Sequence, residues 1–551
     1  MNSISSFIFS PLGPVLVLGI GAGIIVLVGR RVRRPAQLTG LALVVVAVAG
    51  WLWLQLRFQQ VVPIFSLPWK PLLQTGANLE WLGEGLNWYI SGLLLLLSGL
   101  GILIDTRESR EIDGVQLRSR LHIALGVHLA VLAASLLFVG SNNLLTTILT
   151  WVLLDMLLLV RAHPDEQSGS LDTEEGAMLF QDAGNKGFSM LGALLLMIGL
   201  LPAGATGPGQ PFLTGTLAQE TVVIMLLASA LRTGIYPFHL WLLPKQGSEV
   251  NLSERLLEQM VPTLCGLWLA GWAIGLGGSA LLLHPEIAAG LIILLLLGSL
   301  AAFFARDQAT HTTLVLVNAA GSAALCGTLA EFRGPSALIW PTTAFALGGA
   351  LWLIGERVWR TWGWQLPVSI GALTLAGVPF TPGFLSQATF ARMLTLGMPF
   401  SVLFILYVFA QMFQIGALLR SWGGMVSVQE NKTSASVMWR LLIACVAIGL
   451  PLALTGILPN TVSALVSLPG SIPTLLGSPP SVVAELPVWI TLALPLLFGI
   501  LLVWLWLLLP APAVGWLSLV GEVLRLDWLF SFGWWSVNGI SEIWGSALRV
   551  I

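Results

Sequence analysis

Charged residues and cysteines are scarce in this sequence. Asp, Glu, Lys and Arg make up 9% of the 551 residues, whereas 56% are hydrophobic, and the formal net charge is −1. Soluble globular domains carry about 25% charged residues, so this composition excludes a soluble protein and predicts an integral membrane protein. The cysteines lie far apart in apolar segments without metal-ligand spacing, which argues against a disulfide framework or a metal site: Cys265, Cys326 and Cys445.

Sequence signatures of nucleotide and nucleic-acid binding are also missing. The chain has no glycine-rich dinucleotide fingerprint, no phosphate-binding loop and no long polar stretch that could fold as a soluble domain. We therefore expect neither nucleotide nor nucleic acid as a partner. We also expect no catalytic residue, no metal site, no bound cofactor and no redox centre in this chain, so any oxidoreductase activity would belong to partner subunits.

The chain does contain a succession of apolar runs. About 14 to 16 of them reach the roughly 18 residues that cross the hydrocarbon core of a membrane, which predicts an all-α, polytopic membrane helix bundle. The first run, about residues 12 to 29, lacks a basic leader and a small-residue cleavage site, so we interpret it as a retained helix. The segment "RRVRR", which begins at Arg30, marks the cytoplasmic side and predicts an N-terminus outside.

Two of the apolar segments are interrupted by proline. "GIYPFHLW" contains Pro237, and "AGVPFTPGF" contains Pro379. Proline removes a backbone donor and frees a carbonyl, which is tolerated at membrane depth only where protein or water satisfies the freed group. In transporters, such breaks at matching places in two halves of a chain indicate inverted repeats with the functional site at the break. A pair of simple proline kinks is the alternative interpretation.

The residues around both prolines carry a family resemblance. "ALRTGIYPFHLWLLPKQ" resembles the broken-helix signature of the antiporter-like membrane subunits of respiratory complex I, and "LAGVPFTPGFLSQ" resembles their second broken helix through Gly377, Pro379 and Gly383. "NNLLTTILTW" and "RDQATHTTLVLVNAAG" are similar to two further stretches of that family, and the matches span about Leu121 to Met425 in family order. The family also includes subunits of Mrp-type cation/proton antiporters, membrane-bound hydrogenases and inorganic-carbon uptake systems.

This resemblance implies a domain organisation. Two inverted five-helix repeats, each with one broken helix, would occupy residues 120–275 and 276–425, with the breaks near Pro237 and Pro379. N-terminal membrane helices would precede them in residues 1–119, and C-terminal membrane helices with a tail would follow in residues 426–551. The resemblance also implies the inner or plasma membrane of a prokaryote, or an equivalent energy-transducing membrane.

The sequence departs from the family where charge is relayed. The resemblance places a proton-handling glutamate at Val152 and lysines at Arg232, Ala309 and Gln387. Asp155 lies close to the helical face of Val152 and could replace the glutamate in part. A guanidinium group does not release its proton, so Arg232 can hold a charge but cannot relay one. We therefore predict that Arg232 pairs with Asp155 as a fixed charge beside the first break. The alternative is that Arg232 snorkels to the membrane surface or caps a helix end.

Four further residues are candidates for ion translocation. His239 lies next to the first break and can titrate near neutral pH, and Glu258 could connect the polar axis to the cytoplasm. A surface ion pair explains Glu258 about equally well. Lys186 begins an apolar run and could simply mark its end, and for His128 a core or interfacial position outweighs proton transfer.

Two functions follow from the resemblance. The first is a membrane-arm subunit of a complex I-like, redox-driven assembly that translocates protons or other cations. Its partners would be homologous antiporter-like subunits, other membrane-arm subunits, a module with the quinone site, and soluble redox subunits that hold flavin and iron–sulphur clusters, with lipid around the bundle. The second is a subunit of a non-redox Mrp-type cation/proton antiporter or of an inorganic-carbon uptake complex. In either assembly the missing lysines favour a scaffold or partial channel over a complete proton relay.

Overall fold

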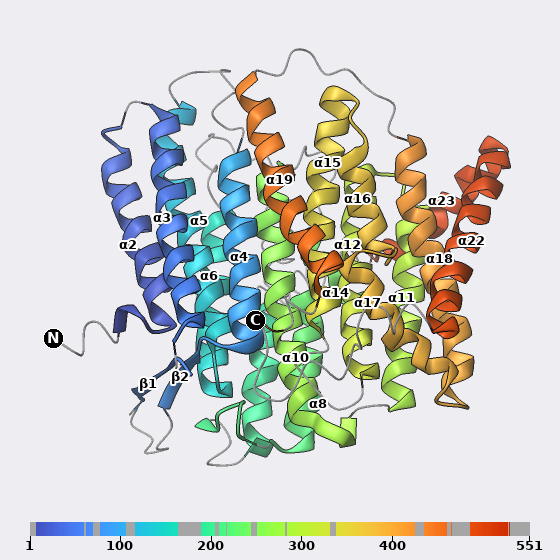
Figure 1. Ribbon diagram of the computed structural model, residues 1–551, viewed down its shortest axis with the longest axis horizontal. Helices are drawn as coiled ribbons and strands as arrows, with labels where there is room; N and C mark the ends of the chain where they lie inside the picture. The colour runs from blue at the N-terminus through green and yellow to red at the C-terminus, as the bar shows by residue number, and fades with distance from the viewer. Residues whose placement is uncertain are drawn as a thin grey trace, which may run out of the picture.

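The structure is a computed structural model, and Figure 1 shows it as a bundle of roughly parallel helices. It describes residues 7–32, 34–59, 62–69, 78–105, 116–162, 189–203, 209–215, 217–243, 251–281, 284–330, 338–424, 435–459 and 485–526, together with 464 and 528. Within these residues, 12 helices are long and apolar enough to cross a membrane, and two shorter apolar helices cover Ser189–Ala203 and Leu366–Leu375. The predicted all-α, polytopic bundle is confirmed.

The N-terminal part combines three helices with a small hairpin. The elements are α2 (Leu12–Gly29), α3 (Pro35–Arg57), β1 (Ile64–Pro68), β2 (Asn78–Leu82) and α4 (Gly85–Ile104). The two strands pair antiparallel, with Phe65 opposite Trp81. In Figure 1, α2 and α3 form the left edge of the bundle, and the hairpin lies at the opposite end from the turn that joins them. The sequence prediction did not include this hairpin.

A first series of helices contains the first break. Its elements are α5 (Gln116–Gly140), α6 (Leu144–Ala162), the helix Ser189–Ala203, α8 (Gln219–Thr233), the one-turn helix η3 (Phe238–Leu242), α9 (Leu252–Glu254), η4 (Arg255–Met260) and α10 (Val261–Leu281). The stretch from α9 to α10 is one continuous helix in which η4 is a π-helical segment. Such segments interrupt the regular hydrogen-bond ladder and occur often at functional sites.

A second series repeats this order. Its elements are α11 (Pro285–Phe304), α12 (Gln308–Leu329), α14 (Ile339–Thr343), the π-helical η5 (Ala344–Gly348), α15 (Gly349–Trp362), α16 (Leu366–Leu375), α17 (Pro382–Ala391), η6 (Arg392–Leu394) and α18 (Phe400–Gly424). Each series thus has three helices, then a broken helix, then a long helix. The shared order agrees with the predicted pair of five-helix repeats, while the repeat boundaries and their inversion stay predictions.

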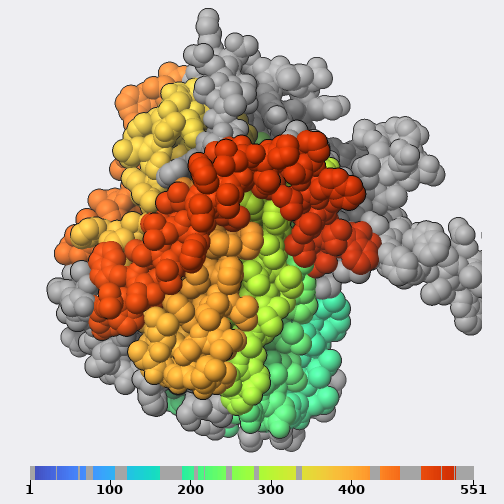
Figure 2. All heavy atoms as spheres, turned by 90° about the vertical axis from the view of Figure 1, so that its right-hand side faces the viewer, coloured from blue at the N-terminus to red at the C-terminus, as the bar shows by residue number. Residues whose placement is uncertain are grey.

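The C-terminal helices pack on the outside of the second series. They are α19 (Ala435–Ile457), α22 (Leu486–Leu508) and α23 (Ala511–Arg525). Figure 2 shows α22 and α23 in red, as an arch that passes over the orange α18 and the yellow-green α11. Arg306, which follows α11, forms an ion pair of 2.8 Å with Glu522 and donates a hydrogen bond of 2.6 Å to Ser518, so α23 is fixed at this end of α11.

The helices at the centre of the bundle differ from those at its edge. α10 and α12 are buried on nearly all sides, whereas α2, α3 and α22 turn apolar side chains outward, for example Leu27 and Leu507, which are 75% and 73% exposed. Outward apolar faces are what a surrounding lipid bilayer requires, because lipid tails are as apolar as leucine. The burial pattern therefore agrees with an integral membrane protein.

Candidate functional site

The first broken helix has a defined backbone geometry. α8 ends at Thr233, and Gly234 adopts a left-handed conformation (φ 71°) that L side chains disfavour. The amide of Ile235 bonds the carbonyl of Ala230 at 3.1 Å, which closes the helix end. Pro237 then precedes η3, where its missing N–H leaves no donor unsatisfied. The chain therefore breaks where the sequence predicts.

The second broken helix is built in the same way. α16 ends at Leu375, Gly377 is left-handed (φ 73°), and Pro379 follows within the non-helical link to α17. Gly383, the second residue of α17, lies so close to α16 that an added Cβ atom would be 2.2 Å from the carbonyl oxygen of Thr374. Only glycine fits at this contact, which explains its place in the signature.

Arg232 lies at the end of α8 and is the centre of a buried polar cluster. Its side chain is fully buried and forms an ion pair with Asp155 of α6. Its Nη1 also donates a hydrogen bond of 2.8 Å to the hydroxyl of Ser189, and the indole of Trp151 donates one of 2.8 Å to Asp155. We call Arg232, Asp155, Ser189 and Trp151 the Arg232 cluster. It joins three helices of the first series and places the predicted pair in direct contact.

The geometry of the Arg232 cluster decides between the interpretations of this arginine. Snorkelling would expose the guanidinium group, and helix capping would aim it at backbone carbonyls, yet the group is buried against a carboxylate. Aromatic rings flank it, with the Cζ atom 5.1 Å from the Trp151 ring centre and 5.8 Å from that of Phe138. Buried charges are costly in a membrane unless they are paired. Arg232 is therefore a paired, fixed positive charge beside the first break.

The two histidine candidates lie elsewhere. His239 is fully buried, and its ring stacks on Tyr236 at 5.0 Å, while the hydroxyl of Tyr236 donates a hydrogen bond of 3.0 Å to the carbonyl of Leu524. His239 thus lies toward the end of α23. His128 is buried on α5 and packs against Gly101 of α4. In the described part of the chain, neither histidine is a hydrogen-bond partner of the Arg232 cluster, and Lys186 falls outside the described residues.

Glu258 lies on η4, also outside the Arg232 cluster. Its carboxylate pairs at 3.0 Å with Arg161, which is two turns along α6 from Asp155. The Glu258 side chain is 31% exposed, so solvent screens the pair. The sequence prediction did not include Arg161 among the candidate residues, nor this contact, although a basic residue in the last turn of a membrane span was the available signal.

We expect the substitution Glu258→Gln to have a small effect. A partly exposed ion pair contributes about 0–1 kcal/mol, so the free energy of unfolding should fall by less than about 1 kcal/mol, and ion transport by the assembly should persist. Thermal unfolding in mild detergent and ion flux in proteoliposomes measure both quantities, with Arg161→Gln as the matched variant. Loss of ion flux in an intact assembly would instead make Glu258 part of an ion path.

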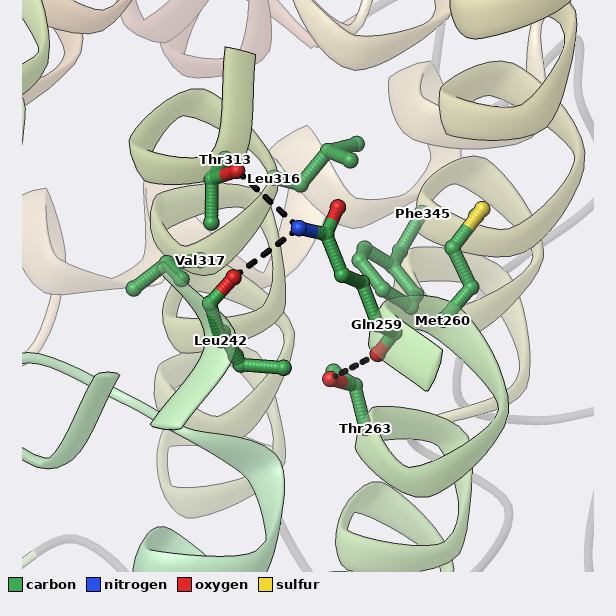
Figure 3. Close-up of a pocket in the computed structure, with 8 residues that line it drawn as sticks. All are labelled: Leu242, Gln259, Met260, Thr263, Thr313, Leu316, Val317 and Phe345. Atoms are coloured by element: carbon green, nitrogen blue, oxygen red, sulfur yellow. Dashed lines mark hydrogen bonds between the residues drawn. The ribbon is translucent and has the colours of Figure 1, made fainter. Parts of the chain in front are cut away.

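A small cavity lies between the two π-helical segments. Figure 3 shows Gln259 in its centre, donating from Nε2 to the carbonyl of Leu242 at 2.9 Å and to the hydroxyl of Thr313 at 3.2 Å. The Oε1 atom of Gln259 is buried without a hydrogen-bond partner among the described residues, and the cavity has room for about one water molecule. All side chains that line it are neutral: Leu242, Gln259, Met260, Thr263, Thr313, Leu316, Val317 and Phe345.

Among the described residues of the second series, amide side chains occupy much of the interior between the helices. Gln387, at the position where the resemblance expects a lysine, is buried on α17 with its Nε2 close to Gly377 at the second break. Between α12 and α18, Asn318 donates to Gln414 at 3.1 Å, and Gln414 donates to the carbonyl of Val315 at 3.0 Å. Amide groups hold a fixed hydrogen-bond pattern and do not change charge near neutral pH. Charged pairs in this half, such as Glu356 with Arg360 at 2.6 Å, lie near helix ends.

Asp307 caps the N-terminus of α12. Its carboxylate accepts hydrogen bonds of 2.9 Å from both the amide and the hydroxyl of Thr310. Partial burial by itself raises the pKa of Asp307, but the hydrogen bonds from Thr310 outweigh it, so the pKa lies below its usual value. The charged carboxylate is thus the form that the fold stabilises.

We expect Asp307→Asn to destabilise the protein at neutral pH by no more than about 1 kcal/mol, the usual value of an N-cap. Because the pKa of Asp307 is lowered on folding, its extra stabilisation is complete above the unfolded pKa of about 3.9 and is lost as the pH falls through the folded value. Thermal unfolding of both forms between pH 3 and 7 measures this. A difference in stability that widened in acid would contradict the expectation.

Comparisons with known proteins agree with this architecture. No protein-family model and no curated protein matches the amino-acid sequence. By fold, a chain of the Mrp complex from Dietzia sp. matches with a TM-score of 0.73 and 17% identity, over 97% of this chain and 60% of that chain. A chain of the membrane-bound sulfane sulfur reductase, an archaeal respiratory membrane complex, matches with a TM-score of 0.62 and 15% identity, over 82% of this chain and 76% of that chain. The chain therefore shares its fold with chains of these two membrane complexes, and it spans about 60% of the length of the Mrp chain.

Proposed function

We propose that this chain is a membrane subunit of a multi-subunit assembly that translocates protons or other cations, and that it serves there as a scaffold or partial channel. The Arg232 cluster carries this proposal. A relay needs groups that change protonation state, whereas Arg232 keeps its charge and is paired with Asp155. The shape of the family, with two broken helices, is kept, while the lysine positions of the second half hold Ala309 and Gln387, whose side chains carry no charge.

The driving reaction of the assembly distinguishes two forms of this proposal. In the first, soluble redox subunits with flavin and iron–sulphur clusters, together with a quinone-site module, drive translocation, as in a complex I-like enzyme. The similarity to a respiratory membrane complex supports this form. In the second, no redox chemistry is involved, as in an Mrp-type antiporter, and the similarity to the Mrp complex over 97% of the chain supports it. An inorganic-carbon uptake complex is a variant of the second form.

Purification of the intact assembly from its own membranes tests both forms. The chain is extracted in mild detergent, and every protein that co-migrates with it is identified by mass spectrometry. Homologous antiporter-like subunits with flavin and iron–sulphur proteins support the redox-driven form, and antiporter-like subunits without them support the non-redox form. A chain that migrates alone and transports ions by itself in proteoliposomes would contradict the proposal.

A further inference from the structure

The turn between α2 and α3 concentrates positive charge. Arg30 and Arg31 follow α2 directly, Arg34 precedes α3, and all three side chains are exposed. In the part of the chain that the structure describes, no carboxylate forms an ion pair with any of them. Glu80 is the first acidic residue of the sequence, so the α2–α3 hairpin contains no acidic residue of its own. The charge at this turn is therefore not neutralised within the hairpin.

An apolar strip begins directly at this turn. The outward side chains of α2 and α3 recur every three to four residues, so they line one face of each helix. These side chains are all more than one third exposed: Ile20, Ile24 and Leu27 on α2, and Val44, Val48 and Trp51 on α3. Both helices stand at the edge of the bundle in Figure 1, where α5 packs against the inner side of α2 and leaves the outer side uncovered.

We propose that the turn and the strip together bind an anionic phospholipid, with the phosphate at Arg30, Arg31 and Arg34 and the acyl chains along the strip. The argument is charge complementarity joined to an adjacent apolar face. A guanidinium group presents a planar fork of donors that matches a phosphate, which a single lysine ammonium does not. Arginines at the surface of a membrane attract anionic lipid by about 1 kcal/mol each. The proposal is independent of which assembly contains the chain.

A photocrosslinkable phosphatidylglycerol tests this site. The full chain, purified within its assembly and washed free of lipid, is titrated with the probe, and the crosslinked peptides are identified by mass spectrometry. We expect crosslinks in residues 12–57. In Arg30→Gln/Arg31→Gln, half-maximal crosslinking of that region should need about 25-fold more probe, since each arginine contributes about fivefold. The control Arg357→Gln/Arg440→Gln removes two arginines from other parts of the chain and should change the probe concentration for half-maximal crosslinking little.

Other outcomes would overturn the proposal. Equal crosslinking by a phosphatidylcholine probe would mean that only the apolar strip is recognised, or that an acidic segment already covers the arginines. Equal losses in both double variants would indicate diffuse surface charge. Displacement of the probe by an equal concentration of inorganic phosphate would indicate a free-phosphate site. If the glutamine variant does not assemble, the salt dependence of crosslinking to the wild-type protein tests the proposal instead. Crosslinking should weaken as the salt concentration rises, and crosslinking that does not depend on salt would contradict the site.

Discussion

Substituting Arg232 by leucine should lower the free energy of unfolding by about 3–5 kcal/mol, because it leaves the carboxylate of Asp155 buried without its partner. Ser189 and the indole of Trp151 would still donate to that carboxylate, but neither brings a charge. The largest effect should be loss of the assembled complex from membranes. Thermal unfolding in mild detergent and the yield of intact assembly measure it.

The double variant Asp155→Asn/Arg232→Leu separates charge balance from ion transport. Removing both charges together is often close to neutral for stability, whereas removing one is not. We expect the double variant to assemble much better than Arg232→Leu and to keep ion flux in proteoliposomes. The yield of assembled complex for Arg232→Lys should fall between those of Arg232→Leu and the wild type, since lysine keeps the charge but lacks the planar fork of donors. An assembled double variant that no longer moved ions would show that the Arg232 cluster is part of an ion path, against the scaffold proposal.

The sequence made the Arg232 cluster partly predictable. Asp155 comes three residues after Val152, so both lie near one face of α6. A charged arginine within an apolar helix is costly without a partner, which made an ion pair of Arg232 predictable. Ser189 could not be foreseen in the same way, because it comes from a different helix and a single serine is common in membrane helices. The two breaks were predictable because proline and left-handed glycine act locally, through the backbone of their own segment.

Other features depended on tertiary contacts. His239 was a candidate because it lies next to the first break, and the structure stacks it on Tyr236. Glu258 was a candidate because it could connect the polar axis to the cytoplasm, with a surface ion pair as the alternative, and the structure pairs it with Arg161. The cavity at Gln259 was not predicted from the sequence, although an amide within an apolar run is itself costly and is a usable signal. The strands β1 and β2 are each five residues long, which is too short for their alternation to stand out from apolar flanks.

The second large effect is expected at Asn87, which ties α4 to α10. Its Oδ1 accepts hydrogen bonds from the indoles of Trp268 and Trp272, at 2.7 and 2.8 Å, and its Nδ2 donates to the carbonyls of Leu82 and Ser141, at 3.3 and 3.4 Å. The residue is 1% exposed. One amide therefore satisfies four buried polar groups that belong to β2, to the end of α5 and to α10.

Asn87→Leu should cost about 3 kcal/mol or more in the free energy of unfolding. Each buried donor or acceptor left without a partner costs about 1–3 kcal/mol, and leucine at this position would leave two buried indole N–H groups without an acceptor. The double substitution Trp268→Phe/Trp272→Phe removes both indole donors. In that background, Asn87→Leu should lower the free energy of unfolding much less than it does in the wild type. Thermal unfolding of the four forms gives the coupling free energy. If the losses in the free energy of unfolding simply add, Asn87 does not hold the two helices together through these hydrogen bonds. Apolar packing between α4 and α10 would then hold the N-terminal helices against the first series.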